Sequence, residues 1–193
     1  MRSIHVDRDL RLRDPTQADA AELFELIDAN RRYLARWLPW PSLIRTVADE
    51  HEWIRSRLIP GASDNELALL IIFGGAIAGG LGIAGLGSPN RAAEVGYWLS
   101  ESLQGHGIVT RSCHAALEYT FEARSINRVQ IRAAVDNTRS RAVPERLGFT
   151  FEGVQRQAVL VGGAFQDLAV YSLLATEWRS KSGPAVRPPT PVR

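Results

Sequence analysis

Two glycines flank a histidine at Gly105-His106-Gly107, directly before a stretch with helical periodicity. Glycine costs about 1 kcal/mol inside a helix relative to alanine, so this start needs a reason. Backbone without side chains can approach an anion closely. The free N–H groups of a first helical turn, reinforced by the helix dipole, bind phosphate oxygens. The pattern therefore indicates a phosphate-binding helix start, with a ligand-free, glycine-softened turn as the alternative. No Gly-Lys-Ser/Thr follows, which excludes a P-loop.

A second glycine pattern, Gly80-x-Gly82-x-x-Gly85, matches the dinucleotide fingerprint by its spacing. That fingerprint requires a helix that opens at the last glycines and receives the pyrophosphate. Here the following residues, LGSPNRAAEVGYW, have the composition of a loop and then a strand. We interpret the match as a by-product of a glycine-rich β-hairpin.

The elements around the Gly-His-Gly motif follow from their periodicity. Residues 93–100 predict a strand and 105–123 a helix. We expect further strands at 10–13 (an edge strand), at 128–135 and on both sides of residues 162–163. Further helices are expected from Thr16 to a break at Asn30, over 31–41, from a cap at Thr46, and over 138–147. Front helices followed by interleaved strands and helices predict an α/β (α+β) fold, a sheet flanked by helices.

Leu67 to Gly87 is a run of 21 residues without a charge, nominally long enough to cross a bilayer. Seven of these residues are glycine, and Gly74-Gly75 stands where a two-residue hairpin turn would. Two adjacent buried strands are therefore preferred to a membrane span.

Apolar residues make up 45% and charged residues 23% of the 193 residues, a balance typical of a soluble protein with one domain. The formal charge of +2 comes from the C-terminal end, because residues 1–178 hold 19 basic and 21 acidic side chains. This distribution gives no case for nucleic-acid binding. We expect one domain over 1–178 and a flexible, proline- and arginine-rich tail over 179–193.

Cys113 is the single cysteine, which excludes an intramolecular disulfide and a cysteine-rich metal site. Its place on a helical stripe favours a core thiol over an acyl-carrying nucleophile. A lone cysteine suits a reducing cytoplasm, and the charged N-terminus does not have the form of a secretory signal. We therefore expect a cytoplasmic protein without a metal, and we expect the side chains of His106 and His114 to be solvated.

Several segments in order, AEVGYWLSESLQGHGIVTRS, DNTRSRAVPERLGF and EGV, together resemble the GNAT superfamily of acyl-CoA-dependent N-acetyltransferases. With YLARWLPW near the front, they resemble more narrowly its RimJ/RimL-type branch, which acetylates the N-termini of ribosomal proteins. The likeness spans roughly residues 8–178 and implies a central mixed, mostly antiparallel, splayed sheet. Gln104 and Gly107 meet the superfamily signature Gln/Arg-x-x-Gly-x-Gly/Ala, whereas Val109 replaces its small last residue, which implies a slightly shifted pyrophosphate.

The resemblance implies acetyl-CoA as the acyl donor. Backbone amides of seven consecutive residues would hold its pyrophosphate: Gln104, Gly105, His106, Gly107, Ile108, Val109 and Thr110. The backbone at Trp98 and Leu99 would pair with the pantetheine arm. Asn137 would contact the cofactor arm, and Ser140 would lie by the sulfur.

Attack by an amine requires that amine to be neutral, so a base or a water chain must take its proton. In the pattern of the branch, Glu101 matches the position of the base, and Glu94 is a second candidate. A backbone N–H of the 93–100 strand would stabilise the oxyanion, and Ser140 could donate a proton to the thiolate. Without the resemblance, an exposed glutamate at a strand end is a solvated residue. Trp37 and Trp40 either wall an acceptor cleft or only pin a helix to the sheet.

The resemblance therefore implies an N-acetyltransferase that works by direct attack in a ternary complex. A protein or peptide N-terminal α-amine is the first choice of acceptor. The alternatives are a small amine, a polyamine or an antibiotic, with acetyl-CoA, succinyl-CoA or another acyl-CoA as donor. A catalytically inactive acyl-CoA-binding module that regulates a partner is a third interpretation. The branch also implies a homodimer.

Overall fold

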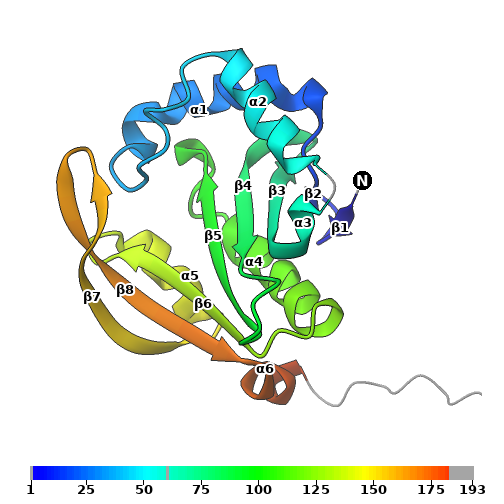
Figure 1. The fold of residues 1–193 in the computed structure, drawn as a ribbon, viewed down its shortest axis with the longest axis vertical. Helices are drawn as coiled ribbons and strands as arrows, with labels where there is room; N and C mark the ends of the chain where they lie inside the picture. Colours follow the sequence, from blue (N-terminus) through cyan, green and yellow to red (C-terminus); the bar gives the residue numbers. More distant parts are fainter. Residues whose placement is uncertain (1, 60, 183–193) are drawn as a thin grey trace, which may run out of the picture.

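The centre of the molecule is an eight-stranded sheet in the order β1-β2-β3-β4-β5-β6-β8-β7 (Figure 1). This computed structural model describes residues 2–59 and 61–182. Among the described strands, β5 and β6 are parallel and the other neighbours are antiparallel. The strands are β1 (Ser3–His5), β2 (Leu10–Arg13), β3 (Glu66–Phe73), β4 (Ala76–Ala84), β5 (Ala92–Leu99), β6 (Arg128–Ala134), β7 (Thr150–Val161) and β8 (Ala164–Leu174). The helices are α1 (Ala20–Leu34), α2 (Val47–Arg57), α3 (Ala62–Asn65), α4 (Ile108–Glu118), α5 (Thr138–Arg146) and α6 (Ala175–Ser182). The expected mixed, mostly antiparallel sheet flanked by helices is confirmed.

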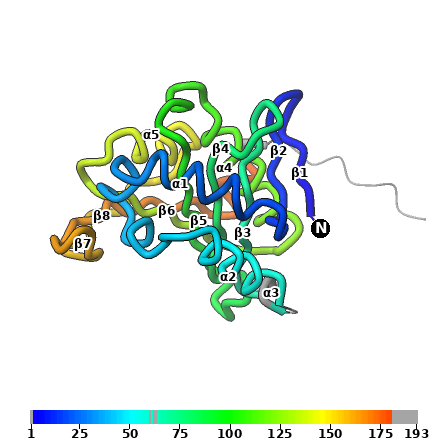
Figure 2. Tube along the Cα trace, turned by 90° about the horizontal axis from the view of Figure 1, so that it is seen from above, coloured from blue at the N-terminus to red at the C-terminus, as the bar shows by residue number. Residues whose placement is uncertain are grey.

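The sheet is covered on both faces because its strands are apolar on both sides. Along β3, Leu69 and Ile71 belong to the main core that α4 completes. Their neighbours Leu70 and Ile72 belong to a smaller cluster with Leu23 and Ile27 of α1, on the opposite face. Figure 2 shows α2 and α3 on one side of the strands and α5 on the other. The uncharged run is thus the expected hairpin around residues 74–75.

The N-terminal segment differs in two ways from its prediction. Leu10–Arg13 forms β2 but does not lie at the sheet edge, because β1 pairs along its free side. The helix that opens after Thr16 does not break at Asn30 but runs on to Leu34, so 31–41 holds no separate helix. Asn30 is buried, and its side-chain amide donates to the carbonyl of Leu26 at 2.8 Å. The polar residue that resembled a break is a buried structural amide.

The N-terminal cap of α2 was predicted from the sequence, whereas the helix α6 was not. Thr46 caps α2 as expected, and Leu58, which ends the helix as its C-cap residue, is exposed. At the C-terminus, α6 spans Ala175–Ser182 and thus includes the first four residues of the segment expected as a tail. The rest of the predicted tail, 183–193, lies outside the described residues.

Two glycines of β4 let β5 pass at close range. A Cβ atom on Gly79 would lie 2.2 Å from the carbonyl oxygen of Trp98, and one on Gly80 would lie 2.6 Å from the indole nitrogen of Trp98. Gly82, on the same strand, has no atom nearer than 3.8 Å to such a position. The approach of Trp98 therefore explains Gly79 and Gly80 without any ligand.

We expect Gly79→Ala to lower the free energy of unfolding by about 2–3 kcal/mol, because the new methyl group would force β4 and β5 apart. Gly82→Ala is the matched control on the same strand, and its effect should stay below about 0.5 kcal/mol. Urea unfolding followed by circular dichroism measures both variants. Equal stability of the two variants would contradict the close packing described.

Candidate active site

β5 and β6 are neighbours in the sheet but pair over only part of their length. Their ladder holds Ala92, Ala93 and Glu94 of β5, and beyond Glu94 the strands diverge (Figure 1). The other edge of β5 stays paired with β4 from Glu94 to Leu99. The backbone of residues 95–99 therefore faces the gap with polar groups that need partners. This divergence is the splay that the resemblance implies.

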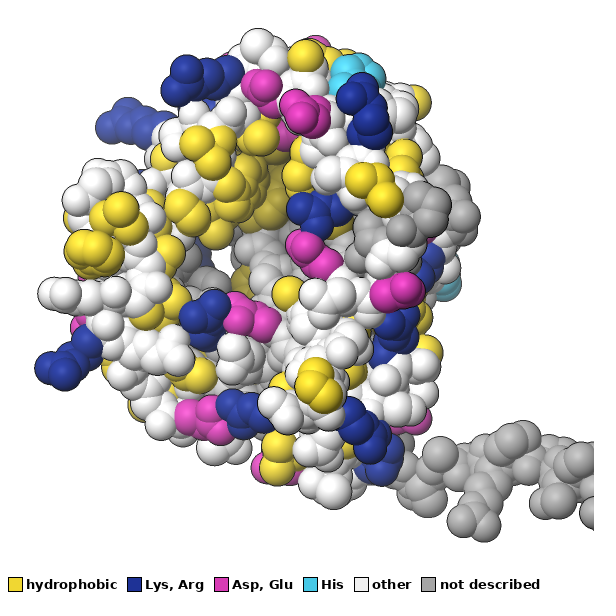
Figure 3. Space-filling model, viewed as in Figure 1, with side chains coloured by type: hydrophobic (Ala, Val, Ile, Leu, Met, Phe, Trp, Pro, Cys, Tyr) yellow, Lys and Arg dark blue, Asp and Glu magenta, His cyan; other side chains and the backbone are white. Residues whose placement is uncertain are grey.

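A cavity of about 990 Å³ occupies the splay and extends to the N-terminus of α4. Its size is at the upper end of that of small-molecule sites. Figure 3 shows the surface hollowed at this place, with hydrophobic side chains along one wall. Thirteen of the predicted site residues line the cavity: Trp37, Glu94, Trp98, Leu99, Glu101, Gln104, Gly105, Gly107, Ile108, Val109, Thr110, Asn137 and Ser140. His106 and Trp40 lie outside its lining.

The Gly-His-Gly turn precedes the helix instead of occupying its first turn. Gly105 and Gly107 have φ of +83° and +69°, a left-handed conformation that glycine adopts without strain. Gly107 is the N-cap of α4 and supplies no side-chain cap. The first helical hydrogen bond runs from the N–H of Arg111 to the carbonyl of Gly107, so the three N–H groups before Arg111 point out of the helix end. This uncapped end fits an anion. The side chain of His106 is exposed.

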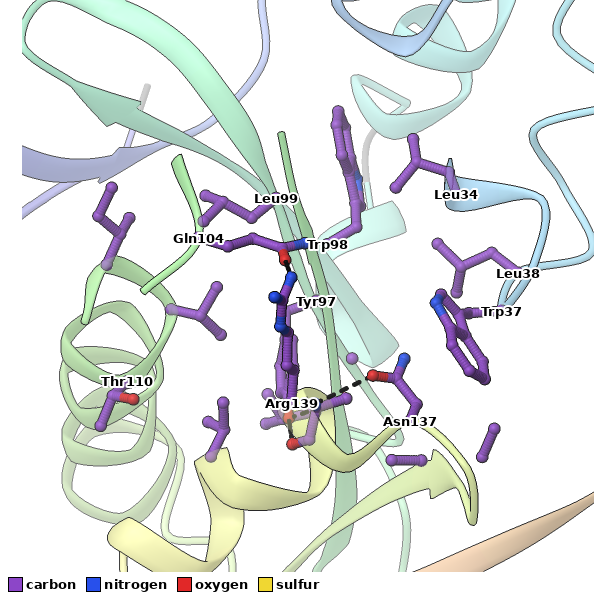
Figure 4. Close-up of a pocket in the computed structure, with 18 of the residues that line it drawn as sticks. Leu34, Trp37, Leu38, Tyr97, Trp98, Leu99, Gln104, Thr110, Asn137 and Arg139 are labelled. Carbon is purple, nitrogen blue, oxygen red and sulfur yellow. Dashed lines mark hydrogen bonds between the residues drawn. The ribbon is translucent and has the colours of Figure 1, made fainter. Parts of the chain in front are cut away.

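Gln104 connects the two walls of the cavity through its side chain (Figure 4). Its amide nitrogen donates to the hydroxyl of Tyr33 on α1, and its amide oxygen accepts from the guanidinium of Arg139 on α5. Arg139 thereby lies across the cavity from α5 toward the glycine turn, where its charge adds to that of the helix end. The sequence reasoning missed Arg139, although it stands between the predicted residues Asn137 and Ser140.

Asn137 and Ser140 form the start of α5. The side-chain oxygen of Asn137 accepts from the N–H of Ser140 at 3.1 Å and so caps the helix. The hydroxyl of Ser140 lies 3.4 Å from that of Tyr97, which donates to the carbonyl of Ser140 at 2.8 Å. Burial raises the pKa of Tyr97 far above its usual range, so its phenol keeps its proton. Two neighbouring hydroxyls therefore hold protons beside the splay.

Glu101 begins a 3₁₀ turn, Glu101–Leu103, which is separated from the end of β5 by Ser100. Its side chain is exposed to the cavity, and its N–H donates to the side-chain oxygen of Asn30 at 2.9 Å. Asn30 thus fixes the backbone of Glu101 from the middle of α1. The sequence signal for this role was the polar residue inside an otherwise apolar helical stripe.

Glu94 lies at the point where β5 and β6 separate. One carboxylate oxygen accepts from the side-chain amide of Gln130 at 2.9 Å, and the other pairs with the guanidinium of Arg132 at 3.0 Å. Both oxygens are therefore engaged, whereas Glu101 has no side-chain partner among the described residues. The geometry favours Glu101 over Glu94 as a proton acceptor.

The two predicted tryptophans lie in different cavities. Trp37 lines the first cavity, and its ring lies under the guanidinium of Arg36 at 5.3 Å. Trp40 lines a second cavity of about 410 Å³ and makes an edge contact with Trp98, with 5.8 Å between ring centroids. The cavities adjoin at β5, since Trp98 belongs to both linings.

Comparison with known proteins agrees with this architecture. The family description "Acetyltransferase (GNAT) domain" matches residues 9–150. The putative ribosomal N-acetyltransferase YdaF of Bacillus subtilis is 38% identical over 177 residues, which cover 89% of this chain and 93% of that protein. The chain belongs to the GNAT acetyltransferase family. It is therefore an N-acetyltransferase.

Two solved structures of family members are similar over most of their length. RimL, the ribosomal L7/L12 α-N-protein acetyltransferase, in complex with coenzyme A, has a TM-score of 0.86 and 29% identity, covering 91% of this chain and 99% of that chain. The microcin C7 self-immunity acetyltransferase MccE, in complex with acetyl-CoA and AMP, has a TM-score of 0.82 and 30% identity, covering 88% and 94%. Both therefore hold CoA or its acetyl ester on this GNAT fold.

Within the described residues, no helix is long and apolar enough to cross a membrane. The same residues contain no group of three or more histidine, cysteine, aspartate or glutamate side chains placed to hold a metal ion. Cys113 is fully buried, and burial raises the pKa of its thiol. This environment keeps the thiol protonated and poorly nucleophilic.

Glu50 is a further residue that the sequence reasoning missed. It lies on the inner side of α2, is 2% exposed and lines the second cavity. Burial raises the pKa of Glu50 to about 7, and the neighbouring charge of Asp49 adds to the rise. Glu66 and Glu94, the other acids of that cavity, are both paired with arginines.

We expect Glu50→Gln to stabilise the protein at alkaline pH. The folded-state pKa lies above the ordinary value of 4.5, so the folded state binds the extra proton and stability falls as pH rises through 4.5 to about 7. At pH 8 the free energy of unfolding of the variant should therefore exceed that of the wild type by about 3 kcal/mol, and near pH 4 the difference should vanish. Urea unfolding at both pH values measures this. A loss of stability at pH 8 would contradict it.

Proposed function

We propose that this GNAT member transfers the acetyl group of acetyl-CoA to the N-terminal α-amine of a protein, with a ribosomal protein as the acceptor. The observation that carries the proposal is the arrangement of the first cavity, where an unpaired edge of β5 meets the uncapped end of α4. Relatives named as ribosomal-protein acetyltransferases, YdaF and RimL, support this choice of acceptor. The match covers nearly the whole length of both relatives, so the comparison does not rest on a fragment of either protein.

The residues present fit acetyl-CoA. The N–H groups of Ile108, Val109 and Thr110 would hold its pyrophosphate at the end of α4, with the guanidinium of Arg139 nearby. The open backbone edge of β5 at Trp98 and Leu99 would take the amide groups of the pantetheine arm as an added strand. When bound, acetyl-CoA supplies a thioester, which is the activated form of the acetyl group.

We assign proton transfers to residues of the cavity. Glu101 accepts the proton of the acceptor ammonium at its carboxylate, which faces the cavity without a side-chain partner among the described residues. A backbone N–H on the free edge of β5 stabilises developing negative charge. Ser140 holds a donatable proton at its hydroxyl, and the protonated phenol of Tyr97 keeps that hydroxyl in place. Glu94 stays a second candidate for the base, but it would have to give up its ion pair with Arg132 in order to accept a proton.

We also propose that the catalytic domain spans 1–178, that the protein is cytoplasmic, and that two copies form a homodimer. The outer hairpin supports a contact between copies, since Phe151 of β7 and Phe165 of β8 are 50% and 64% exposed. Sedimentation velocity would report the association state, and a monomer at all protein concentrations would contradict the proposed homodimer.

The acceptor class can be tested by release of CoA from acetyl-CoA with a panel of amines. We expect turnover with peptides that carry a free N-terminus, and at least tenfold lower kcat/KM with polyamines and aminoglycosides. A peptide with an acetylated N-terminus is the matched negative control. Release with a polyamine alone would favour the small-amine enzyme, and binding of CoA without release on any acceptor would favour the regulatory module.

The base can be tested with Glu101→Gln, which removes the proton-accepting carboxylate but keeps the size of the side chain. We expect kcat to fall at least tenfold while the Kd for CoA, measured by calorimetry, stays within twofold. Glu118→Gln, an exposed glutamate on α4, serves as the control and should match the wild type. Unchanged turnover in the Glu101 variant would remove Glu101 from this role.

A further inference from the structure

The second cavity lies on the α1 and α2 side of the sheet and adjoins the first cavity. Its walls come from α1, α2, the segment between them, and the strands β3, β4 and β5. Five residues line both cavities: Leu38, Glu94, Gly96, Tyr97 and Trp98. A group bound in the second cavity would therefore lie next to the free edge of β5.

Three tryptophans give this cavity an aromatic wall. Trp40 and Trp98 meet edge to face, and Trp53 comes from α2. The faces of indole rings carry negative charge density and attract cations. The protein already uses this property here, since the guanidinium of Arg57 lies 5.8 Å from the ring centre of Trp53.

The ionisable residues that line the second cavity are acidic. Glu66 pairs with Arg57 at 2.6 Å, and Glu94 pairs with Arg132 at 3.0 Å. Glu50 is 2% exposed, and its carboxylate has neither a hydrogen bond nor an ion pair with any residue that the structure describes. A buried carboxylate without a partner lowers the stability of the folded state. Glu50 lines the second cavity, where a cation would supply the missing partner.

We propose that the second cavity binds a cationic group of the acceptor and that Glu50 is the residue that pairs with it. The inference rests on the proposed function, because it takes an amine-bearing acceptor as given. An ammonium or guanidinium group satisfies both features of the cavity, the aromatic faces and the unpaired carboxylate. A neutral hydrogen-bond donor would leave the charge of Glu50 unbalanced, and an acidic group would be repelled by it. Glu50 is thus a residue of acceptor specificity.

The cation can come from two parts of the acceptor. One source is the acceptor's own ammonium before it loses its proton, and the other is a basic side chain near its N-terminus. Two peptides that differ in one residue, lysine or its uncharged isostere norleucine, distinguish these sources. If the cation is a basic side chain, Glu50→Gln should raise the KM of the lysine peptide alone. If the cation is the reacting ammonium, the substitution should raise the KM of both peptides equally.

The test compares Glu50→Gln with the wild type in acetyl transfer at pH 8.5, where the carboxylate is ionised. We expect the KM for at least the lysine peptide to rise tenfold or more, while the KM for acetyl-CoA stays within twofold. Glu52→Gln is the matched control, because Glu52 lies on the same helix but is exposed. Circular dichroism and thermal unfolding verify that each variant is folded, and binding of each peptide to the CoA-loaded protein by calorimetry gives a readout independent of turnover.

The outcomes separate this inference from the proposed function. If the wild type acetylates neither peptide, the proposed acceptor class fails, and calorimetry with the same peptides still tests the cavity. If the wild type acetylates them and Glu50→Gln matches both the wild type and Glu52→Gln in KM and in peptide affinity, the cavity does not bind a cation and the inference is wrong. A folded Glu50 variant that loses affinity for acetyl-CoA instead would also overturn it.

Discussion

The interruption of one hydrogen-bond ladder determines the rest of the site. β5 keeps its pairing with β4 along six residues but pairs with β6 only at Ala92–Glu94. An edge of peptide groups inside a protein has to find partners, and the separation at Glu94 leaves that edge facing a cavity instead of a strand. The uncapped start of α4 opens into the same cavity. Backbone groups of two elements thereby face one cavity, beside polar side chains such as those of Asn137, Arg139 and Ser140.

The position of β5 depends in turn on contacts from both faces. Glycines 79 and 80 let it approach β4, and Val95 and Leu99 anchor it in the core below α4. From the other face, Asn30 of α1 holds the peptide N–H that follows the strand. The same helix also contacts the cavity through Tyr33 and Leu34. The helix that lines the cavity therefore also positions the backbone of Glu101.

Local patterns in the sequence predicted most elements, because caps and periodicity act over a few residues. The glycine turn, the hairpin and the cap at Thr46 are of this kind. The residues that were missed act over long separations: Asn30 meets Glu101, Tyr33 and Arg139 meet Gln104, and Glu50 lines one cavity together with residues of β5. No spacing rule connects such positions. We took Asn30 for a helix break because asparagine is common at helix ends, whereas here its side chain is buried and bonded within the helix.

The glycines of the β3–β4 hairpin show how a search for glycine-rich cofactor motifs can be misled. Gly80 and Gly85, two of the three positions that imitate a dinucleotide fingerprint, are glycine because β5 crowds them: a Cβ would meet the indole of Trp98 in one case and the carbonyl of Ala92, at 2.8 Å, in the other. Such a pattern records contact between neighbouring strands and not contact with a nucleotide. A search that scores glycine spacing alone therefore counts a tightly packed hairpin such as this one as a cofactor site, although a strand and not a helix follows the last glycine.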